Sequence, residues 1–270
     1  MTKISDQADL WLERFRPPAS AITCRLICFP HAGGAASFFF RVSSLLPTSV
    51  DVLAVQYPGR QNRRHEECIT DVARLADLIS HRVCDLDDTP IVLFGHSMGA
   101  LLAFEVARRM EAGRRHALAG LVVSGRRAPF LRREEKIHTL DDDSLLDHLC
   151  ELGGTDRRLM QDRDVRMMII PAIRADYTAA ETYRYVCGPK LNCPLAVFTG
   201  DRDPMVSADE ARAWRDHVAG KFTLRVFPGG HFYLQEHYSA TTAALGEEIS
   251  SFLSMAPRCC QTRAPRPPMR

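Results

Sequence analysis

Residues 90–105 read PIVLFGHSMGALLAFE and join two different apolar patterns. The first part, Ile91–Phe94, is a short continuous apolar run of the kind found in buried parallel strands. From Ala100 onward the residues are good helix formers, and this second pattern continues to Gly113. The five residues Gly95–Gly99 lie between the two patterns. The stretch therefore predicts a strand, a sharp turn that carries Ser97, and a helix.

A Gly-Xaa-Ser-Xaa-Gly turn between a strand and a helix is typical of the nucleophile elbow of the α/β-hydrolase fold. The elbow strains the backbone of its serine, and the small residues Gly95 and Gly99 relieve the crowding. It also places the Ser97 hydroxyl at a helix N-terminus, where backbone N–H groups meet a developing oxyanion. The five-residue pattern alone is weak, and a purely structural turn is the alternative. The flanking strand and helix favour a catalytic serine.

Apolar runs recur along the chain and alternate with helical patterns. This alternation predicts an α/β protein with a mostly parallel central sheet and helices on both faces. The expected strands are Arg25–Phe29, Asp51–Gln56, Ile91–Phe94, Gly120–Ser124, Leu195–Thr199 and Thr223–Phe227. The expected helices are Ala36–Leu46, Ile69–Cys84, Ala100–Ala112, Ala208–Ala219 and Ala240–Ser254.

One connection, about residues 126–190, is longer than an ordinary crossover. It holds two helical stretches, Asp142–Leu152 and Asp162–Tyr185, which are joined by two glycines. In this fold such an insertion predicts a helical lid over the active site, and the alternative is a helical hairpin remote from the mouth. We expect a single domain over residues 1–255 that includes this insertion. The proline-rich, basic residues 256–270 are expected to form a disordered tail.

The acid and the histidine of an α/β-hydrolase follow the serine in the chain, each just past the end of a strand. His231 follows the last expected strand and is predicted to be the base, because His217 and His237 fall in expected helices. Asp203 follows the preceding strand and is the favoured acid. Asp201 lies on the same turn and stays open as an alternative.

The loop Pro30–Gly34 follows the first strong strand and is predicted to complete the oxyanion hole. Its glycines let the backbone approach a substrate, so the N–H of Ala32 would act together with the N–H of Met98. His31 lies on the same loop. A second catalytic base is one interpretation of His31, and a packed or solvated loop histidine is the favoured one.

The composition fits a folded globular protein, with 46% hydrophobic residues and a formal net charge of +2. This charge gives no reason to expect nucleic-acid binding. The first residues lack the apolar core of a signal peptide, and no apolar run is long enough to span a membrane. Nine irregularly spaced cysteines favour reduced thiols, so we expect a cytoplasmic protein. We also expect a monomer. Metal and phosphate-loop motifs are absent from the sequence, and we expect no metal, nucleotide or other cofactor.

Five separated motifs together resemble the type II (stand-alone) thioesterases of polyketide and non-ribosomal peptide synthesis. They are Phe29–Gly34, Gln56–Arg60, Gly95–Gly99, Gly200–Asp203 and Gly229–His231. The likeness spans about Trp11 to Leu253. The turn Tyr57–Arg60 is its most diagnostic part, because generic lipases and esterases need nothing there. Some related thioesterases carry the acid one strand earlier, where this chain has Ser124–Arg127 and no carboxylate.

The resemblance implies hydrolysis of acyl or aminoacyl thioesters from the phosphopantetheine arm of acyl or peptidyl carrier protein domains. Such editing removes misprimed or stalled units during antibiotic biosynthesis. Ser97 would attack the thioester, His231 would be the base, and Asp203 would hold the imidazole. A carboxylester hydrolase for small oxyesters with the same three residues is one alternative. A non-catalytic binding module of the hydrolase fold is another.

Two further hypotheses concern the surroundings of the serine. Phe38, Phe39, Met167 and Met168 are candidates to line an acyl channel, and the alternative is that they only pack the core. Arg132 and Arg133 are candidates to dock an acidic carrier protein, and the alternative is an ordinary solvated surface. Further arginines follow strand ends on the expected catalytic edge of the sheet: Arg60, Arg63, Arg64, Arg126 and Arg127.

Overall fold

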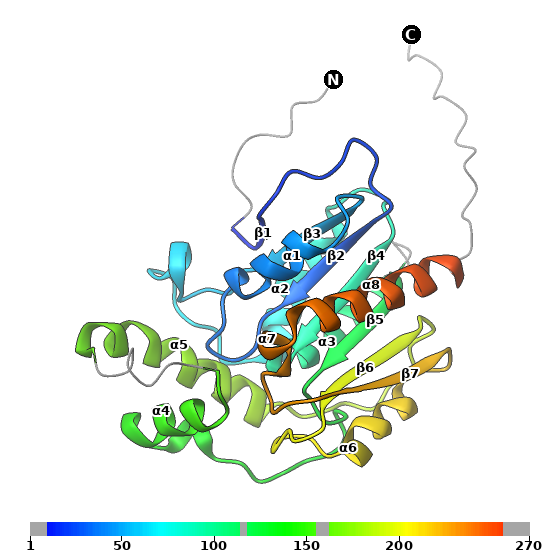
Figure 1. Cartoon of the computed structure of the whole chain (residues 1–270). Coiled ribbons are helices and arrows are strands. Elements are labelled where there is room, and N and C mark those ends of the chain that lie inside the picture. Colours follow the sequence, from blue (N-terminus) through cyan, green and yellow to red (C-terminus); the bar gives the residue numbers. More distant parts are fainter. Residues whose placement is uncertain (1–9, 114–117, 155–161, 256–270) are drawn as a thin grey trace.

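The computed structural model describes residues 10–113, 118–154 and 162–255. Seven strands in this part form one sheet in the order β1-β3-β2-β4-β5-β6-β7 (Figure 1). Only β1 runs antiparallel to its neighbour, β3; every other neighbouring pair of these strands is parallel. The strands are β1 (Leu12–Arg14), β2 (Cys24–Phe29), β3 (Val50–Val55), β4 (Ile91–His96), β5 (Leu118–Ser124), β6 (Leu195–Gly200) and β7 (Phe222–Phe227).

Helices cover both faces of the sheet. One face packs against α2 (Val72–Cys84), α3 (Met98–Gly113) and α6 (Ala208–Arg212). The other face packs against α1 (Phe40–Leu45), α7 (Tyr233–Glu236) and α8 (Tyr238–Met255). Successive strand residues alternate between the two cores, which is why the strands read as continuous apolar runs rather than as alternating ones. The expected α/β architecture, a parallel sheet covered on both faces, is confirmed.

Three local features differ from the expected elements. Strand β1 was not expected, because its three residues carry no apolar run; it is held at the sheet edge by the Arg14–Asp51 ion pair. The expected helix over 36–46 is a 3-10 turn over Ala36–Phe39 followed by α1. The expected helix over 208–219 likewise divides into α6 and a 3-10 turn. In that tighter turn the Trp214 indole N–H donates to the carbonyl of Arg126 (2.7 Å).

The insertion (residues 126–190) contributes α4 (Asp142–Glu151) and α5 (Arg163–Thr182). Both helices lie beyond the carboxyl ends of the central strands (Figure 1). Apolar residues of the two helices pack on one another in a small separate core, formed by Leu145, Leu146, Leu149, Ile170 and Ile173. The predicted tail, residues 256–270, lies outside the described residues.

The described part of the chain is simple in its covalent and membrane features. None of its seven cysteines forms a disulfide. Within the same residues, no helix is long and apolar enough to cross a membrane, and no group of three His, Cys, Asp or Glu residues has the arrangement of a metal site.

The turn from β4 into α3 is as tight as the sequence predicts. Ser97 has a left-handed backbone with φ of +56°. A Cβ at Gly95 would lie 2.0 Å from the carbonyl oxygen of Gly99, and a Cβ at Gly99 would lie 2.0 Å from that of Phe29. Both distances are far below van der Waals contact, so only glycine fits. The missing side chain at position 99 lets the first turn of α3 rest on the end of β2.

Gly99→Ala is expected to lower the free energy of unfolding by roughly 1–3 kcal/mol or more, because the added methyl overlaps backbone that has no room to move. Gly113→Ala is the matched control in the same helix, since a Cβ there would meet nothing within 4 Å. That control should be neutral or slightly stabilising, as alanine favours a helix over glycine. Urea unfolding of both variants makes the comparison. Similar losses at the two positions would contradict this account of the turn.

Candidate active site

Three side chains meet at the carboxyl edge of the sheet. Ser97 comes from the turn after β4, Asp203 from the loop after β6, and His231 from the loop after β7. The His231 Nε2 lies 3.0 Å from the Ser97 Oγ, and its Nδ1 lies 3.0 Å from the Asp203 Oδ2. These partners assign the tautomer in which Nδ1–H donates to the carboxylate and Nε2 accepts from the hydroxyl. A hydroxyl, an imidazole and a carboxylate are thus joined in one hydrogen-bonded line.

Of the two candidate acids, only Asp203 contacts the imidazole. Its carboxylate is buried, and Oδ1 also accepts a hydrogen bond from the N–H of Met205 (2.8 Å). Asp201 is exposed and accepts from the N–H of Gly229 (2.9 Å). Asp201 therefore braces the turn that precedes His231, while Asp203 holds the His231 side chain itself.

The two predicted oxyanion donors belong to different elements. Met98 is the first residue of α3, so its N–H has no acceptor within the helix. Ala32 lies on the loop after β2. Among the residues that the structure describes, neither N–H donates a hydrogen bond. Two unpaired backbone donors next to a nucleophilic hydroxyl are what an oxyanion hole requires.

The turn Gln56–Arg60 supports the loop that carries Ala32. The Tyr57 hydroxyl donates to the carbonyl of Pro30 (3.1 Å), and Arg60 Nη1 donates to the carbonyl of Gly34 (3.0 Å). The side chain of Gln56 accepts from the N–H of Ala36 (2.8 Å), where the loop ends. All three side chains are buried. The motif that is most diagnostic in the sequence thus anchors the loop along its whole length.

Three of the arginines considered for docking are structural instead. Arg60 forms a buried, two-bonded ion pair with Asp176 of α5, at 2.6 and 2.9 Å. Arg63 pairs with Glu66 and lies 4.0 Å above the Trp11 ring, and Arg127 pairs with Glu135. The sequence-based expectation that Arg60, Arg63 and Arg127 present free charge to a partner is wrong, because all three are buried.

Asp176 is a residue of the site that sequence analysis missed. It lies in α5, 116 positions after Arg60, and its side chain is buried. Besides Arg60, it accepts a hydrogen bond from the N–H of Gly33 (2.7 Å), next to Ala32. The sequence does contain a sign that Asp176 is buried. An aspartate at position 176 interrupts the apolar face of α5 between Ile173 and Ala179, and a charged residue on such a face needs a partner.

Two further imidazoles lie close to His231. His31 packs between the rings of Phe38 and Phe232, with centroids 4.7 and 4.8 Å away, and its Nδ1–H donates to the Ala32 carbonyl (2.9 Å). Burial lowers the pKa of His31 from 6.5 to about 4. His96 is fully buried, and burial also lowers its pKa well below 6.5. No hydrogen bond joins His31 to Ser97 in the described structure, so the packed interpretation of His31 fits the geometry.

The four candidate channel residues do not lie together. Phe39 is fully buried and packs edge-on against Phe94 in the core under the sheet, at 5.6 Å between centroids. Met167 and Met168 each leave 59% of their surface exposed on α5. Only Phe38 lies beside the site, against His31. The expectation that Phe39 lines an acyl channel is therefore wrong, and the two methionines are not packed in a channel wall.

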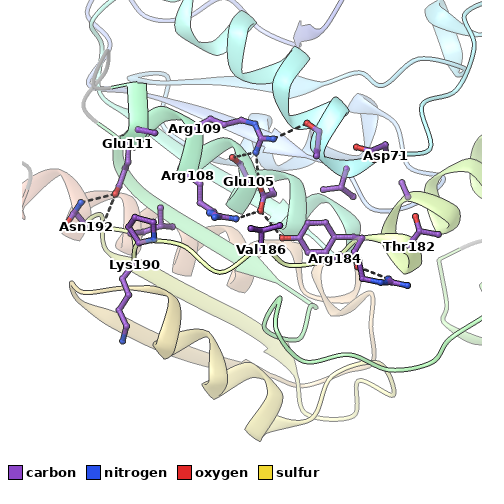
Figure 2. Close-up of a pocket in the computed structure, with 17 residues that line it drawn as sticks. Asp71, Glu105, Arg108, Arg109, Glu111, Thr182, Arg184, Val186, Lys190 and Asn192 are labelled. Atoms are coloured by element: carbon purple, nitrogen blue, oxygen red, sulfur yellow. Dashed lines mark hydrogen bonds and ion pairs between the residues drawn. The ribbon is translucent and has the colours of Figure 1, made fainter.

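A cavity of about 740 Å³ lies away from the serine, between α3, the start of α2 and residues 182–192 (Figure 2). Its charged side chains bond to one another: Glu105 accepts from Arg108, Arg109 and the hydroxyl of Tyr183. Neither Ser97, Asp203 nor His231 lines it. The cavity is thus separate from the candidate active site, and its charged lining is largely satisfied internally.

Comparison with known proteins gives a consistent result. The family model described as a thioesterase domain matches residues 24–251. Thioesterase PikA5 of Streptomyces venezuelae is 44% identical over 266 residues, which cover 96% of this chain and 91% of that protein. A probable cadicidin biosynthesis thioesterase of Streptomyces griseus is 46% identical over 92% of this chain and 68% of that protein.

Solved structures agree. The type II thioesterase BorB from the borrelidin biosynthetic cluster is 47% identical in sequence. Its structure superposes with a TM-score of 0.84, and the match covers 91% of this chain and 100% of that one. YbtT, a type II thioesterase from the yersiniabactin NRPS/PKS pathway, is 30% identical with a TM-score of 0.81 over 90% of this chain and 99% of that one. The chain, with its serine at the turn after β4, belongs to the thioesterase family.

Proposed function

We propose that this thioesterase hydrolyses acyl or aminoacyl groups from the phosphopantetheine arm of acyl or peptidyl carrier protein domains. It would act as an editing enzyme of polyketide or non-ribosomal peptide synthesis, and its likeness to thioesterases of such biosynthetic clusters supports this role. The observation that carries the proposal is the hydrogen-bonded line Asp203–His231–Ser97. The backbone N–H groups of Ala32 and Met98, which donate to no described residue, support it. This arrangement fits acyl transfer through a covalent acyl-enzyme.

In the proposed mechanism the Ser97 hydroxyl attacks the thioester carbonyl and gives its proton to His231 Nε2. Asp203 stabilises the resulting imidazolium through the Nδ1–H. The N–H groups of Ala32 and Met98 bind the tetrahedral oxyanion. The C–S bond then breaks, and the imidazolium protonates the departing thiolate. Water, deprotonated by His231, attacks the acyl-enzyme, releases the acid and restores Ser97.

The insertion is proposed to act as a lid over this site. It contacts both sides of the catalytic edge. A Cβ at Gly33 would lie 2.7 Å from Ile173 of α5, and a Cβ at Gly154, just after α4, would lie 2.5 Å from the Phe232 ring. Gly33 borders the predicted oxyanion donor, and Phe232 directly follows His231. Seated helices in this position exclude water, which strengthens the electrostatic interactions within a site.

Ser97→Ala is expected to lower thioester hydrolysis by roughly 10⁴-fold or more while leaving the thermal unfolding midpoint near that of the wild type. A serine-directed fluorophosphonate should add once to the wild type, at Ser97, as shown by mass spectrometry of peptides. Labelling that persists in Ser97→Ala would show that another residue reacts and that Ser97 is not the nucleophile. An intact fold is the control, because a misfolded variant would lose labelling for another reason.

Asp203→Asn is expected to reduce kcat by roughly 10⁴-fold, because an amide does not hold the His231 tautomer that accepts the serine proton. Asp201→Asn is the matched control two residues away, since its carboxylate bonds only the turn backbone and a neighbouring arginine, Arg202. That variant should stay within about tenfold of the wild-type kcat. Steady-state hydrolysis of an acyl-pantetheine thioester measures both, and a larger loss at position 201 would reverse the assignment.

Ester hydrolysis by the same three residues is the second candidate activity. An oxyester and a thioester substrate differ in the leaving group alone. The two activities are distinguished by comparing kcat/KM for an acyl-carrier thioester, its acyl-pantetheine analogue and a matched oxyester, and the proposed function predicts the highest value for the acyl-carrier thioester. A binding module of the same fold has no need of the complete hydrogen-bonded line, which favours an enzyme.

The carrier protein is proposed to dock on the basic segment that begins the insertion. Arg132 is exposed there, whereas Arg133 is bonded to Glu210 of α6, with Nη2 and Oε2 2.6 Å apart. Both residues belong to the segment that follows the carboxyl end of β5. Ser97 follows the carboxyl end of β4, the parallel neighbour of β5, at the same edge of the sheet. Exposed charges of this kind mainly accelerate encounter with a partner of opposite charge.

The double variant Arg132→Glu/Arg133→Gln is expected to raise KM for acyl-carrier substrate severalfold and to weaken its salt dependence. The glutamine amide at position 133 still offers a donor to Glu210, so the local fold should hold. Hydrolysis of a small acyl-pantetheine should change little, because that substrate has no protein surface. Arg82→Glu, at the end of α2 that leads to the amino end of β4, is the control on the opposite side of the sheet. Equal losses on both substrates would place docking elsewhere.

A further inference from the structure

Helix α5 contacts the predicted oxyanion loop at Gly33 through two side chains one turn apart, Ile173 and Asp176. Ile173 packs so closely that a Cβ at Gly33 would lie 2.7 Å from its Cγ1. Asp176 accepts the hydrogen bond of the Gly33 N–H at 2.7 Å. Gly33 also has a left-handed backbone, with φ of +76°. The loop therefore adopts a backbone that favours glycine, and a helix of the insertion packs directly on it.

The Asp176 carboxylate has only the loop and its anchor as partners among the described residues. Oδ2 accepts from Gly33 N–H and from Arg60 Nη1 (2.6 Å), and Oδ1 accepts from Arg60 Nη2 (2.9 Å). Arg60 Nη1 also donates to the Gly34 carbonyl (3.0 Å). The carboxylate and the guanidinium are both buried. Together they bind the N–H of one loop residue and the carbonyl of the next.

Both polar atoms of one peptide group in the loop are hydrogen-bonded to side chains. The peptide that joins Ala32 to Gly33 has its carbonyl bonded to His31 Nδ1–H (2.9 Å) and its N–H bonded to Asp176. A peptide plane held at both atoms has little freedom to rotate. The plane on the other side of Ala32 carries the N–H that the proposed mechanism uses. Its carbonyl, that of His31, accepts from the Gly34 N–H (2.9 Å), and Arg60 bonds the Gly34 carbonyl. The direction of the Ala32 N–H therefore depends on a turn that Asp176 and Arg60 hold at Gly33 and Gly34.

We propose that Asp176 is a positioning residue, which sets the direction of the Ala32 N–H and makes the oxyanion hole depend on the seating of α5. The proposal rests on the proposed function, since it takes the Ala32 N–H as an oxyanion donor. When α5 lifts, the Gly33 N–H loses its acceptor and Arg60 loses its carboxylate. The hole is then complete only with the insertion seated over the substrate.

A simple removal of Asp176 would leave the Arg60 guanidinium buried without an opposite charge, and the variant would be strongly destabilised for that reason. The test therefore compares two double variants that share the substitution Arg60→Met. Arg60→Met/Asp176→Asn keeps an oxygen that accepts from Gly33 N–H. Arg60→Met/Asp176→Leu has the same branched side-chain shape and number of heavy atoms, and no acceptor. Circular dichroism melting shows that both are folded, and kinetics use a small acyl-pantetheine thioester.

The double variant with Asp176→Leu is expected to show a kcat about 10²-fold below that of the double variant with Asp176→Asn. This loss of kcat is the size expected when one oxyanion donor is lost, about 10²–10³. The KM should stay within about twofold, because the oxyanion forms only after the substrate has bound. Two inhibitors separate positioning from binding. A trifluoromethyl ketone, which forms a tetrahedral adduct on Ser97, should bind about 10²-fold more weakly to the leucine-containing variant. A non-hydrolysable amide analogue, which forms no oxyanion, should bind both variants alike.

Equal kcat values for the two variants would overturn the proposal, because the acceptor for Gly33 would then have no effect on catalysis. Parallel weakening of ketone binding and amide binding would also overturn it, since Asp176 would then affect substrate binding in general and not the oxyanion hole. Failure of the proposed function gives a different result. In that case the ketone fails to add to Ser97 in the wild type, and Ser97→Ala remains active.

Discussion

The close approach of the α3 backbone to the end of β2 is the constraint on which the site depends. Gly99 has no side chain, so the first turn of α3 rests against the carbonyl of Phe29, where a Cβ would come within 2.0 Å. β2 and β4 are parallel neighbours, with Phe29 opposite Gly95. This register brings the loop after β2 to the N-terminus of α3, so the two elements that carry Ala32 and Met98, the proposed oxyanion donors, meet at the edge of the sheet where Ser97 lies. Any larger residue at position 99 would separate the two elements.

A second layer of the structure holds that loop, and it is made of buried charge. The free energy lost when a charged pair leaves water can exceed the attraction between its charges, so a buried ion pair is weak evidence of stability. The effect of Arg60 and Asp176 is instead to fix the orientation of the loop backbone. Their planar groups match in a two-bonded geometry, and their remaining donor and acceptor positions bond Gly33 and Gly34. An apolar pair of the same size would fill the space and leave the loop free to turn.

The sequence predicted the parts of the site whose signal is local. The strand, the Gly95–Gly99 turn and the helix are contiguous, so their pattern is complete within one short stretch. Asp203 and Asp201 share one turn, and only the side-chain direction at the end of β6 separates them. Phe38 and Phe39 are adjacent in a 3-10 turn, which sends one toward His31 and the other into the core. Asp176 lies 116 positions from Arg60, and no local pattern joins residues so far apart.

The three imidazoles at the site illustrate how burial divides similar groups between roles. Burial lowers the pKa of both His31 and His96, and the nearby His231 lowers each further. Both are therefore neutral at pH 7. The His96 ring lies 5.2 Å from that of His231, so a charge on it would oppose the imidazolium that the proposed mechanism forms on His231. His231 alone has the Asp203 carboxylate at its Nδ1. In the proposed mechanism His231 therefore carries the proton, and the neutral His96 ring beside it adds no opposing charge.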